Sequence, residues 1–289
     1  MLEPVVNNSN SLVDPAVISI RGVHKRFAVR RGGKRTEVRA VNGVDLALYA
    51  GETLSLVGES GCGKSTLAKM ILGLSTPTEG TIEYRGHDVH CLRGADLRDF
   101  RRGVQAVVQD PRSSLNPRKR IGWIIGEPLH LLRGLRGKEL DKAVARLLTE
   151  VSLDPKLMSS YPHELSGGMR QRVAIARALS ISPDVIILDE PVSALDVSVR
   201  AQIINLLRDI QESHGVSYFM ISHDLATVGY LSDRIAVMNA GEIVEQGPAE
   251  RILASPEHPY TQELWNAAHI ENLTGDTALE PAAQEADVR

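Results

Sequence analysis

The nonapeptide Gly58–Thr66 restricts the fold of this chain more than any other stretch. It fits the pattern G-x-x-x-x-G-K-[ST] and consists of Gly58, Glu59, Ser60, Gly61, Cys62, Gly63, Lys64, Ser65 and Thr66. A strand-like run, Thr53–Val57, precedes it, and a good helix former, Leu67–Leu72, follows it. The pattern needs this strand–loop–helix context before it indicates a phosphate site. The sequence therefore predicts an α/β core in which a strand ends in an anion-binding loop.

The residue types of this loop suit a nucleotide. Glycines let the backbone bend around an anion, so that successive N–H groups point at the α- and β-phosphates. The helix that follows adds the positive end of its dipole. We expect Lys64 to reach the β- and γ-phosphates and the Ser65 hydroxyl to ligate Mg²⁺. Cys62 presents its backbone, so its thiol is assigned no chemistry. The alternative is a glycine-rich turn that binds nothing, and the context argues against it.

Composition is that of a soluble globular protein and excludes several classes. The 289 residues are 43% hydrophobic and 24% charged, and a net charge of −3 gives no case for nucleic-acid binding. One of the two cysteines, Cys62 and Cys91, lies inside the loop, so we expect a reducing compartment. No secretory signal is visible, and no run approaches the roughly 20 apolar residues of a spanning helix. The best candidate, Ile121–Leu132, is interrupted by Gly-Glu-Pro. A membrane role would be peripheral, with the spanning parts on other chains.

Alternating strands and helices predict an α/β fold with a mainly parallel sheet. The expected strands are Val17–Ile20, Val44–Leu48, Thr53–Val57, Gly80–Tyr84, Val104–Gln109, Val185–Leu188, Ser217–Ile221, Arg234–Met238 and Glu242–Gln246. The early strands are expected to form an antiparallel layer that covers the nucleotide side. Residues 21–39 hold eight Lys and Arg residues. We interpret them as a charged hairpin loop, with a membrane-surface or partner patch as the alternative.

Between Arg112 and about Ser166 the pattern becomes helical. Apolar residues from Leu140 to Val151 recur at helical spacing, which predicts an amphipathic helix. Residues of about 110–168 are therefore expected to form a helical lobe inserted into the core. Further expected helices are Asp96–Arg102 (a helix or a loop), Gly168–Ser180 and Val197–Ser213, the last capped by Asp196. The two ends, 1–15 and the acidic 271–289, are expected to be flexible.

An acidic pair, Asp189 and Glu190, follows the apolar strand Val185–Leu188. Parallel sheets present ligands at the carboxyl ends of their strands, so Asp189 is placed to hold Mg²⁺, directly or through water. Glu190 is placed to polarise an attacking water as a general base. The alternative is an acidic pair that merely starts a helix.

The stretch Leu165-Ser-Gly-Gly-Met169 is the most specific signal in the chain. Here the chain resembles the ABC transporter ATPases, whose signature is Leu-Ser-Gly-Gly-Gln at the start of a helix. Backbone N–H groups, a hydroxyl and a helix N-terminus suit an anionic oxygen. The resemblance implies that Ser166, Gly167 and Gly168 contact the γ-phosphate bound by the other subunit of a dimer. Met169 departs from the usual glutamine, a change that we expect to be tolerated.

Other family motifs follow in the same order. Gln109 matches the Q-loop glutamine, which reaches Mg²⁺ and the attacking water and links to the helical lobe. Ser193–Asp196 matches the D-loop at the dimer interface, and His223 matches the switch histidine. Phe27 is in the position of the aromatic residue that stacks on adenine, although it could also be a core residue. The implied catalytic set is Lys64, Gln109, Glu190 and His223.

The resemblance covers about residues 16–265, and the expected ATPase domain is 16–270. Gln109–Pro117 and the tail motif Ser255–Thr261, within about 247–265, resemble the oligopeptide/dipeptide importer subunits in particular. This resemblance implies ATP and Mg²⁺ as cofactors and a peripheral position on the cytoplasmic face of the inner membrane. The implied partners are two transmembrane permease subunits, a second ATPase subunit (a paralogous chain or another copy) and an extracytoplasmic solute-binding protein, with no nucleic acid. No cysteine follows Cys91, so we expect no iron–sulfur cluster of the kind that some relatives carry in the tail.

The expected function is ATP hydrolysis that drives uptake of oligopeptides or dipeptides, with nickel, glutathione or another small solute as alternative cargos. A soluble ABC ATPase of DNA repair would need a long coiled coil between the loop and the signature. About 100 residues intervene here, without sustained heptads. Translation-type members usually carry two cassettes, and this chain has one. Glu190 and His223 argue against a non-hydrolysing regulatory module, and a nucleotide kinase does not explain Ser166–Gly168.

Overall fold

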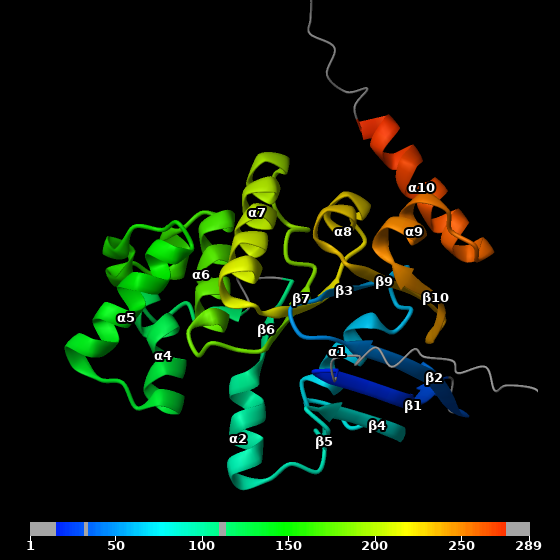
Figure 1. Ribbon diagram of the computed structural model, residues 1–289, viewed down its shortest axis with the longest axis horizontal. Helices are drawn as coiled ribbons and strands as arrows, with labels where there is room; N and C mark the ends of the chain where they lie inside the picture. The colour runs from blue at the N-terminus through cyan, green and yellow to red at the C-terminus, as the bar shows by residue number, and fades with distance from the viewer. Residues whose placement is uncertain (1–15, 32–33, 110–113, 276–289) are drawn as a thin grey trace, which may run out of the picture.

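A computed structural model describes residues 16–31, 34–109 and 114–275. In this part of the chain a four-stranded antiparallel sheet has the order β2-β1-β4-β5, and a six-stranded sheet has the order β10-β9-β3-β8-β7-β6. The antiparallel strands are β1 (Ile18–Arg31), β2 (Lys34–Leu48), β4 (Glu79–Tyr84) and β5 (His87–Asp88). Figure 1 shows this sheet beneath the larger one and a helical lobe beside both. The predicted α/β class, with an antiparallel layer and a helical lobe, is confirmed.

The six-stranded sheet is the frame that carries the candidate site. Its strands are β3 (Thr53–Val57), β6 (Val104–Val107), β7 (Val185–Asp189), β8 (Ser217–Ile221), β9 (Arg234–Asn239) and β10 (Glu242–Pro248). All neighbours pair in parallel except β10, which runs antiparallel to β9. Every residue of β3 and β8 is buried, as expected for strands that are covered on both faces. The carboxyl ends of β3, β6, β7 and β8 therefore meet at one edge.

Helices cover the large sheet and build the lobe. They are α1 (Lys64–Ile71), α2 (Gly94–Gly103), α4 (Ile121–Arg133), α5 (Gly137–Glu150), α6 (Gly167–Leu179), α7 (Val197–His214), α8 (Leu225–Leu231), α9 (Ala249–Ala254) and α10 (Pro259–Gly275), with 3₁₀ turns η1 (Pro155–Ser159) and η2 (Pro162–Glu164). One hydrophobic core joins the lobe, α6 and α7 to the sheet. A second core lies between α1 and the antiparallel layer. The phosphate-binding candidate thus lies where the two layers meet.

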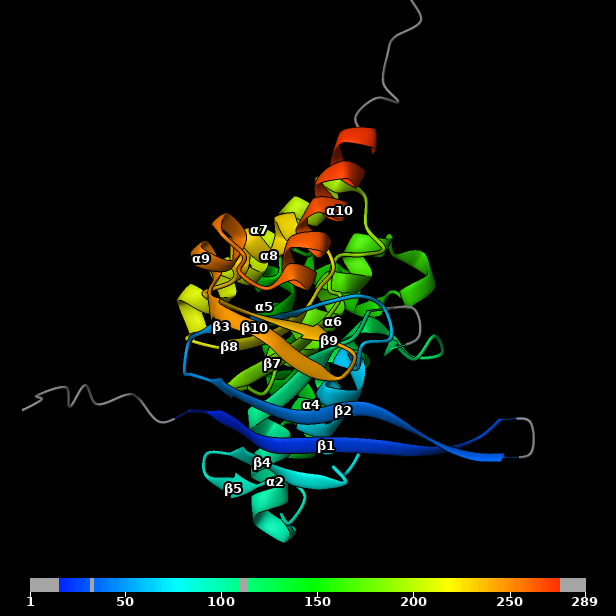
Figure 2. The same ribbon diagram turned by 90° about the vertical axis from the view of Figure 1, so that its right-hand side faces the viewer.

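The charged segment 21–39 is a pair of strands rather than the expected loop. β1 and β2 pair from Ile18 with Leu48 as far as Arg31 with Lys34, and Figure 2 shows them running beyond the rest of their sheet. Arg26 makes ion pairs with Glu79 at 3.0 Å and with Glu37 at 3.9 Å. Such carboxylates lower the cost of placing like charges side by side, so the backbone ladder can continue through basic residues.

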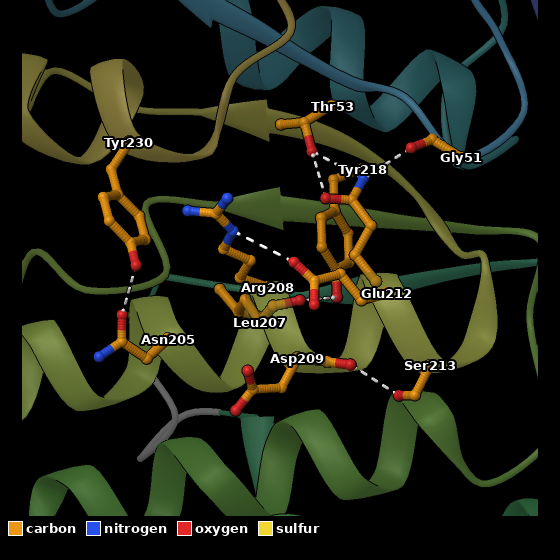
Figure 3. A network of polar contacts seen from close by, with 11 residues as sticks. Gly51, Thr53, Asn205, Leu207, Arg208, Asp209, Glu212, Ser213, Tyr218 and Tyr230 are labelled. Atoms are coloured by element: carbon orange, nitrogen blue, oxygen red, sulfur yellow. Dashed lines mark hydrogen bonds and ion pairs between the residues drawn. The ribbon is translucent and has the colours of Figure 1, made fainter.

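α7 is fastened to the sheet at its C-terminal half, not capped as expected at its start. Asp196 occupies the N-cap position, but its side chain makes no capping hydrogen bond. Instead, Gln211 Nε2 donates to the Gly51 carbonyl and to Thr53 Oγ1, both at 2.9 Å. Tyr218 Oη donates to the Leu207 carbonyl at 2.8 Å (Figure 3), and burial raises the pKa of this phenol. These contacts hold α7 against β3 and β8.

The structure extends the expectation for the C-terminal region. α10 continues to Gly275 and so enters the segment 271–289 that is expected to be flexible, and this expectation stays a prediction. Residues 1–15 and 276–289 lie outside the described residues. The apolar run at 121–132 forms α4, with Pro128 inside the helix. Among the described residues, no helix has both the length and the apolar character needed to cross a bilayer.

Candidate nucleotide site

The phosphate loop has a backbone that only glycine fits at two positions. Gly58 and Gly63 have φ values of 152° and 119°. A Cβ at Gly58 would lie 2.1 Å from the Met238 carbonyl oxygen, and one at Gly63 would lie 2.2 Å from the Ala40 carbonyl oxygen. Both contacts are far below van der Waals distance. The loop therefore lies tightly between β9 and β2, and these two contacts fix its backbone conformation.

The loop presents positive charge and backbone donors. Gly63 is the N-cap of α1 and gives no side-chain cap, so the helix N-terminus can receive an external anion. Lys64 Nζ donates to the carbonyls of Gly58 at 2.7 Å and Glu59 at 2.8 Å, and Cys62 Sγ lies 3.6 Å away. An ammonium group has three donors, and a thiol sulfur is a weak acceptor, so the third donor remains suited to phosphate. Glu59, Ser60, Gly61 and Ser65 are exposed. These features fit a phosphate chain.

Three of the predicted catalytic residues meet at the carboxyl edge of the sheet. Gln109 Nε2 donates to one carboxylate oxygen of Glu190, and His223 Nδ1 lies 3.1 Å from the other. Glu190 has a φ of 48°, an uncommon value for a residue with a side chain. Its N–H donates to the Ile221 carbonyl at 2.9 Å, which holds it in place. Backbone strain of this kind is often retained at functional sites.

Asp189 is the last residue of β7 and precedes Glu190 in the chain. Its pKa is raised, first by burial and then by the charge of Glu190, while Lys64 and Lys69 act in the opposite direction. The charges that act on the pKa of Asp189 thus include a residue of the phosphate loop, Lys64, and a residue of the catalytic cluster, Glu190. Together with the exposed Ser65 hydroxyl, it offers the oxygen ligands that Mg²⁺ prefers.

The loop after β8 is held through Asp224, to which sequence reasoning assigned no role. Asp224 caps α8 by accepting from Ala226 N at 3.1 Å and pairs with Arg200 Nη1 of α7 at 3.0 Å. It also accepts from Thr227 Oγ1 at 2.7 Å. These contacts fix the backbone directly after His223. The capping position of Asp224 was the available signal.

The signature stretch opens α6. Ser166 is the N-cap, and its Oγ accepts from Met169 N at 3.3 Å. A Cβ at Gly168 would lie 2.4 Å from Val199 Cγ1, so this glycine allows α6 and α7 to pack closely. The partly buried Met169 side chain packs against the core, an environment that suits an apolar residue in place of glutamine. In Figure 1, α6, which follows the signature, lies apart from α1, which follows the phosphate loop.

A cavity of about 570 Å³ joins the catalytic edge to the signature helix. Its lining includes Gln109, Gly167, Arg170, Glu190, Ser193 and His223. Ser193 of the predicted D-loop also donates to the Glu190 carbonyl at 3.3 Å. The D-loop thus borders the cavity together with the catalytic residues and the start of the signature helix.

Phe27 is an exposed side chain of β1. Its exposed fraction is 42%, and Lys25 Nζ lies 5.2 Å from the ring centroid. The alternative interpretation of Phe27 as a core residue is therefore wrong. An exposed ring is consistent with a stacking role.

Comparison with known proteins agrees with this geometry. The family model "ABC transporter" matches residues 41–193. The chain is 47% identical over 257 residues to the glutathione import ATP-binding protein GsiA of Pectobacterium atrosepticum, a match that spans 88% of this chain and 41% of GsiA. It is 44% identical over 268 residues to the oligopeptide transport ATP-binding protein AppF of Bacillus subtilis, covering 91% of this chain and 82% of AppF.

A solved structure shares the fold. The ATP-binding cassette MJ0796, described as a dimer in a post-hydrolysis state bound to ADP and Pi, superposes with a TM-score of 0.72 and 30% identity. The match covers 80% of this chain and 98% of MJ0796. The chain spans less than half the length of GsiA but most of AppF and MJ0796. The motifs, the fold and these relatives together show that the chain belongs to the ABC transporter family and is one of its ATP-binding proteins.

Proposed function

We propose that this chain is the ATP-hydrolysing subunit of a membrane importer. The observation that carries the proposal is the convergence of Gln109 and His223 on the carboxylate of Glu190. In a simple binding module, these groups would have no reason to meet beside a phosphate loop. These residues follow the carboxyl ends of parallel strands, and parallel sheets bind ligands at those ends.

The phosphate loop and residues outside it share the task of binding ATP. The backbone of Gly58–Thr66 cradles the α- and β-phosphates, and Lys64 reaches the β- and γ-phosphates. Ser65 and Asp189, with Gln109, would hold Mg²⁺, which neutralises phosphate charge in such sites. Phe27 stacks on the adenine.

Glu190 acts as the general base. Its carboxylate accepts a proton from water as the water oxygen bonds to the γ-phosphorus and the bond to the bridging oxygen breaks, leaving ADP and phosphate. Gln109 and His223 hold this carboxylate in place, because each is bonded to a different oxygen. A positioned base contributes about 10²–10⁴-fold to a rate.

The site is completed by a second ATPase subunit. Ser166 is the N-cap of α6, and Gly167 and Gly168 are its first residues. Figure 1 shows α6 apart from α1, the helix that follows the phosphate loop. In a head-to-tail dimer these three residues would meet the γ-phosphate held by the partner, which is a paralogous chain or another copy. The description of MJ0796 as a dimer with ADP and Pi supports this arrangement.

The helical lobe is the face that meets the membrane subunits. It carries an apolar groove of about 360 Å³ between α4 and α5, beside Trp123 and Leu131, which are 43% and 70% exposed. Short cytoplasmic helices of two permease subunits would dock on this lobe, and a solute-binding protein outside would deliver the cargo. The chain would then lie on the cytoplasmic face of the inner membrane.

We assign short peptides as the cargo class. The printed names of AppF and GsiA refer to oligopeptide transport and glutathione import, and glutathione is itself a tripeptide. The tail motif Ser255–Thr261 supports the same subfamily.

Purification of the whole membrane complex tests the proposal. ATP turnover would be measured in vesicles with peptides, glutathione or nickel presented to the solute-binding protein, with a Lys64→Ala complex as the control. Stimulation by a peptide in the intact complex, and none in the control, is expected. Stimulation by nickel alone would overturn the cargo, and equal turnover in the Lys64→Ala complex would overturn the ATPase assignment.

A further inference from the structure

The C-terminal segment of the chain contacts the phosphate loop. Tyr260, the second residue of α10, places its Oη 3.0 Å from the backbone nitrogen of Glu59, which donates to it. The two residues are 201 positions apart in sequence. The Tyr260 ring is half-buried and packs against the core of the large sheet. The contact therefore joins the far end of the fold to the loop.

A clamp on β10 fixes the position of Tyr260. The buried carboxylate of Glu245 accepts from the backbone nitrogens of Glu257 at 3.0 Å and His258 at 3.1 Å. Burial raises the pKa of Glu245, but these hydrogen bonds outweigh it and lower the pKa overall. Thr261 and Trp265 are buried on the same helix. The start of α10 is thus held on both sides of Tyr260.

The residue that Tyr260 contacts, Glu59, is also a hydrogen-bond partner of Lys64. The peptide N–H of Glu59 is bound by Tyr260, while the Glu59 carbonyl accepts from Lys64 Nζ at 2.8 Å. The orientation of the Glu59 residue therefore contributes to the direction in which the Lys64 ammonium points. Two of its donors are used by loop carbonyls, and the third is available to a phosphate.

We propose that Tyr260 is a positioning residue for nucleotide binding, acting through Glu59 on Lys64. The inference rests on the proposed role of Gly58–Thr66 as the phosphate site. Without the Tyr260 hydroxyl, the loop occupies its binding-competent shape for a smaller fraction of the time. The apparent dissociation constant for ATP rises in inverse proportion to that fraction. Loss of one neutral hydrogen bond corresponds to a change of about 2- to 10-fold.

The test uses the full chain and a fluorescent ATP analogue with Mg²⁺. Tyr260→Phe keeps the ring and removes the hydroxyl. The matched control is Tyr230→Phe, which removes a hydroxyl that donates to Asn205 Oδ1 at 2.9 Å on the α7–α8 side (Figure 3). Glu245→Ala, which loosens the clamp, is a second variant, and Lys64→Ala reports on the loop itself. The melting temperature of each chain is measured without nucleotide.

The expected result is weaker ATP binding in Tyr260→Phe and Glu245→Ala, with a nucleotide-free melting temperature close to wild type in Tyr260→Phe. Tyr230→Phe should bind ATP as the wild type does. A merely structural Tyr260 would lower the melting temperature and leave the dissociation constant unchanged, which would overturn the inference. If the wild type binds ATP and Lys64→Ala does not, but Tyr260→Phe equals wild type, the inference fails while the proposed function stands. If Lys64→Ala binds as wild type does, both fail.

Discussion

Among the described residues, Glu190 has two side-chain partners, Gln109 and His223, and both belong to the predicted catalytic set. We expect Glu190→Gln to reduce ATP turnover by about 10²–10⁴-fold and to leave ATP binding intact, because the amide fills the same space but is no base. Phosphate release and nucleotide affinity would be measured in parallel on the assembled complex. Glu212→Gln is the matched control, since its carboxylate pairs on the surface with Arg208 at 3.3 Å. Turnover of Glu190→Gln within about two-fold of wild type would remove Glu190 from the mechanism.

Partial burial makes the charged form of Asp189 less favourable in the folded chain. Its pKa is raised in the folded chain, so folding favours the protonated form. This group therefore contributes most to stability below the usual pKa of an aspartate, and the contribution is lost as pH rises through the raised pKa.

Asp189→Asn should accordingly remove a cost at neutral pH. We expect the nucleotide-free variant to unfold at an equal or higher urea concentration than wild type at about pH 7, while its Mg²⁺-dependent ATP turnover is lost. The gain should shrink at about pH 4, near the ordinary carboxyl range. Urea unfolding at both pH values checks this, and a clear loss of stability at neutral pH would contradict it.

At the scale of elements, the close contact of α6 and α7 controls where the signature lies. A Cβ at Gly168 would meet Val199 Cγ1 at 2.4 Å, whereas one at Gly167 would meet Leu195 Cδ2 at 3.5 Å. Alanine normally gains up to about 1 kcal/mol over glycine in a helix, but overpacking costs about 1–3 kcal/mol. The stiff, β-branched Val199 has little freedom to move aside.

We therefore expect Gly168→Ala to lower the free energy of unfolding by about 1–2 kcal/mol. Val199→Ala removes the methyl group that would clash. In the Val199→Ala background, Gly168→Ala should therefore cost much less free energy of unfolding than it does in the wild type. Gly167→Ala serves as the steric control and should be near neutral in stability. Denaturant unfolding of the four variants gives the coupling energy, and a coupling near zero would show that this contact does not limit the packing.

Sequence reasoning found the elements whose local residue pattern is enough to predict their secondary structure or their role. The buried strands β3, β7 and β8 are apolar runs, and the loop and signature carry dense motifs. The length of the strands in the charged hairpin was missed because the pairing of Arg26 with Glu37 and Glu79 joins segments that periodicity does not connect. The Tyr260–Glu59 contact was missed for the same reason, since it spans 201 positions. Gly168 was assigned to phosphate alone, because its contact with Val199 exists only once two helices pack.

At the scale of the whole molecule, the chain holds two halves of a nucleotide site on separate elements. The phosphate loop opens α1 beside the antiparallel layer, whereas Ser166 opens α6 beside the lobe (Figure 1). Each half offers a helix N-terminus suited to an anion. A head-to-tail pair of subunits would join the loop of one chain to the signature of the other and so couple hydrolysis to subunit closure.

ATP turnover per ATPase subunit tests this central claim most directly, measured once for the dilute isolated chain and once for the assembled transporter at saturating ATP. The dilute chain lacks the signature donors of a partner, and loss of a single such donor typically costs about 10²–10³-fold. We therefore predict that the isolated chain binds ATP but turns it over about 100-fold or more slowly than the complex. Equal turnover in the two preparations would contradict the shared site.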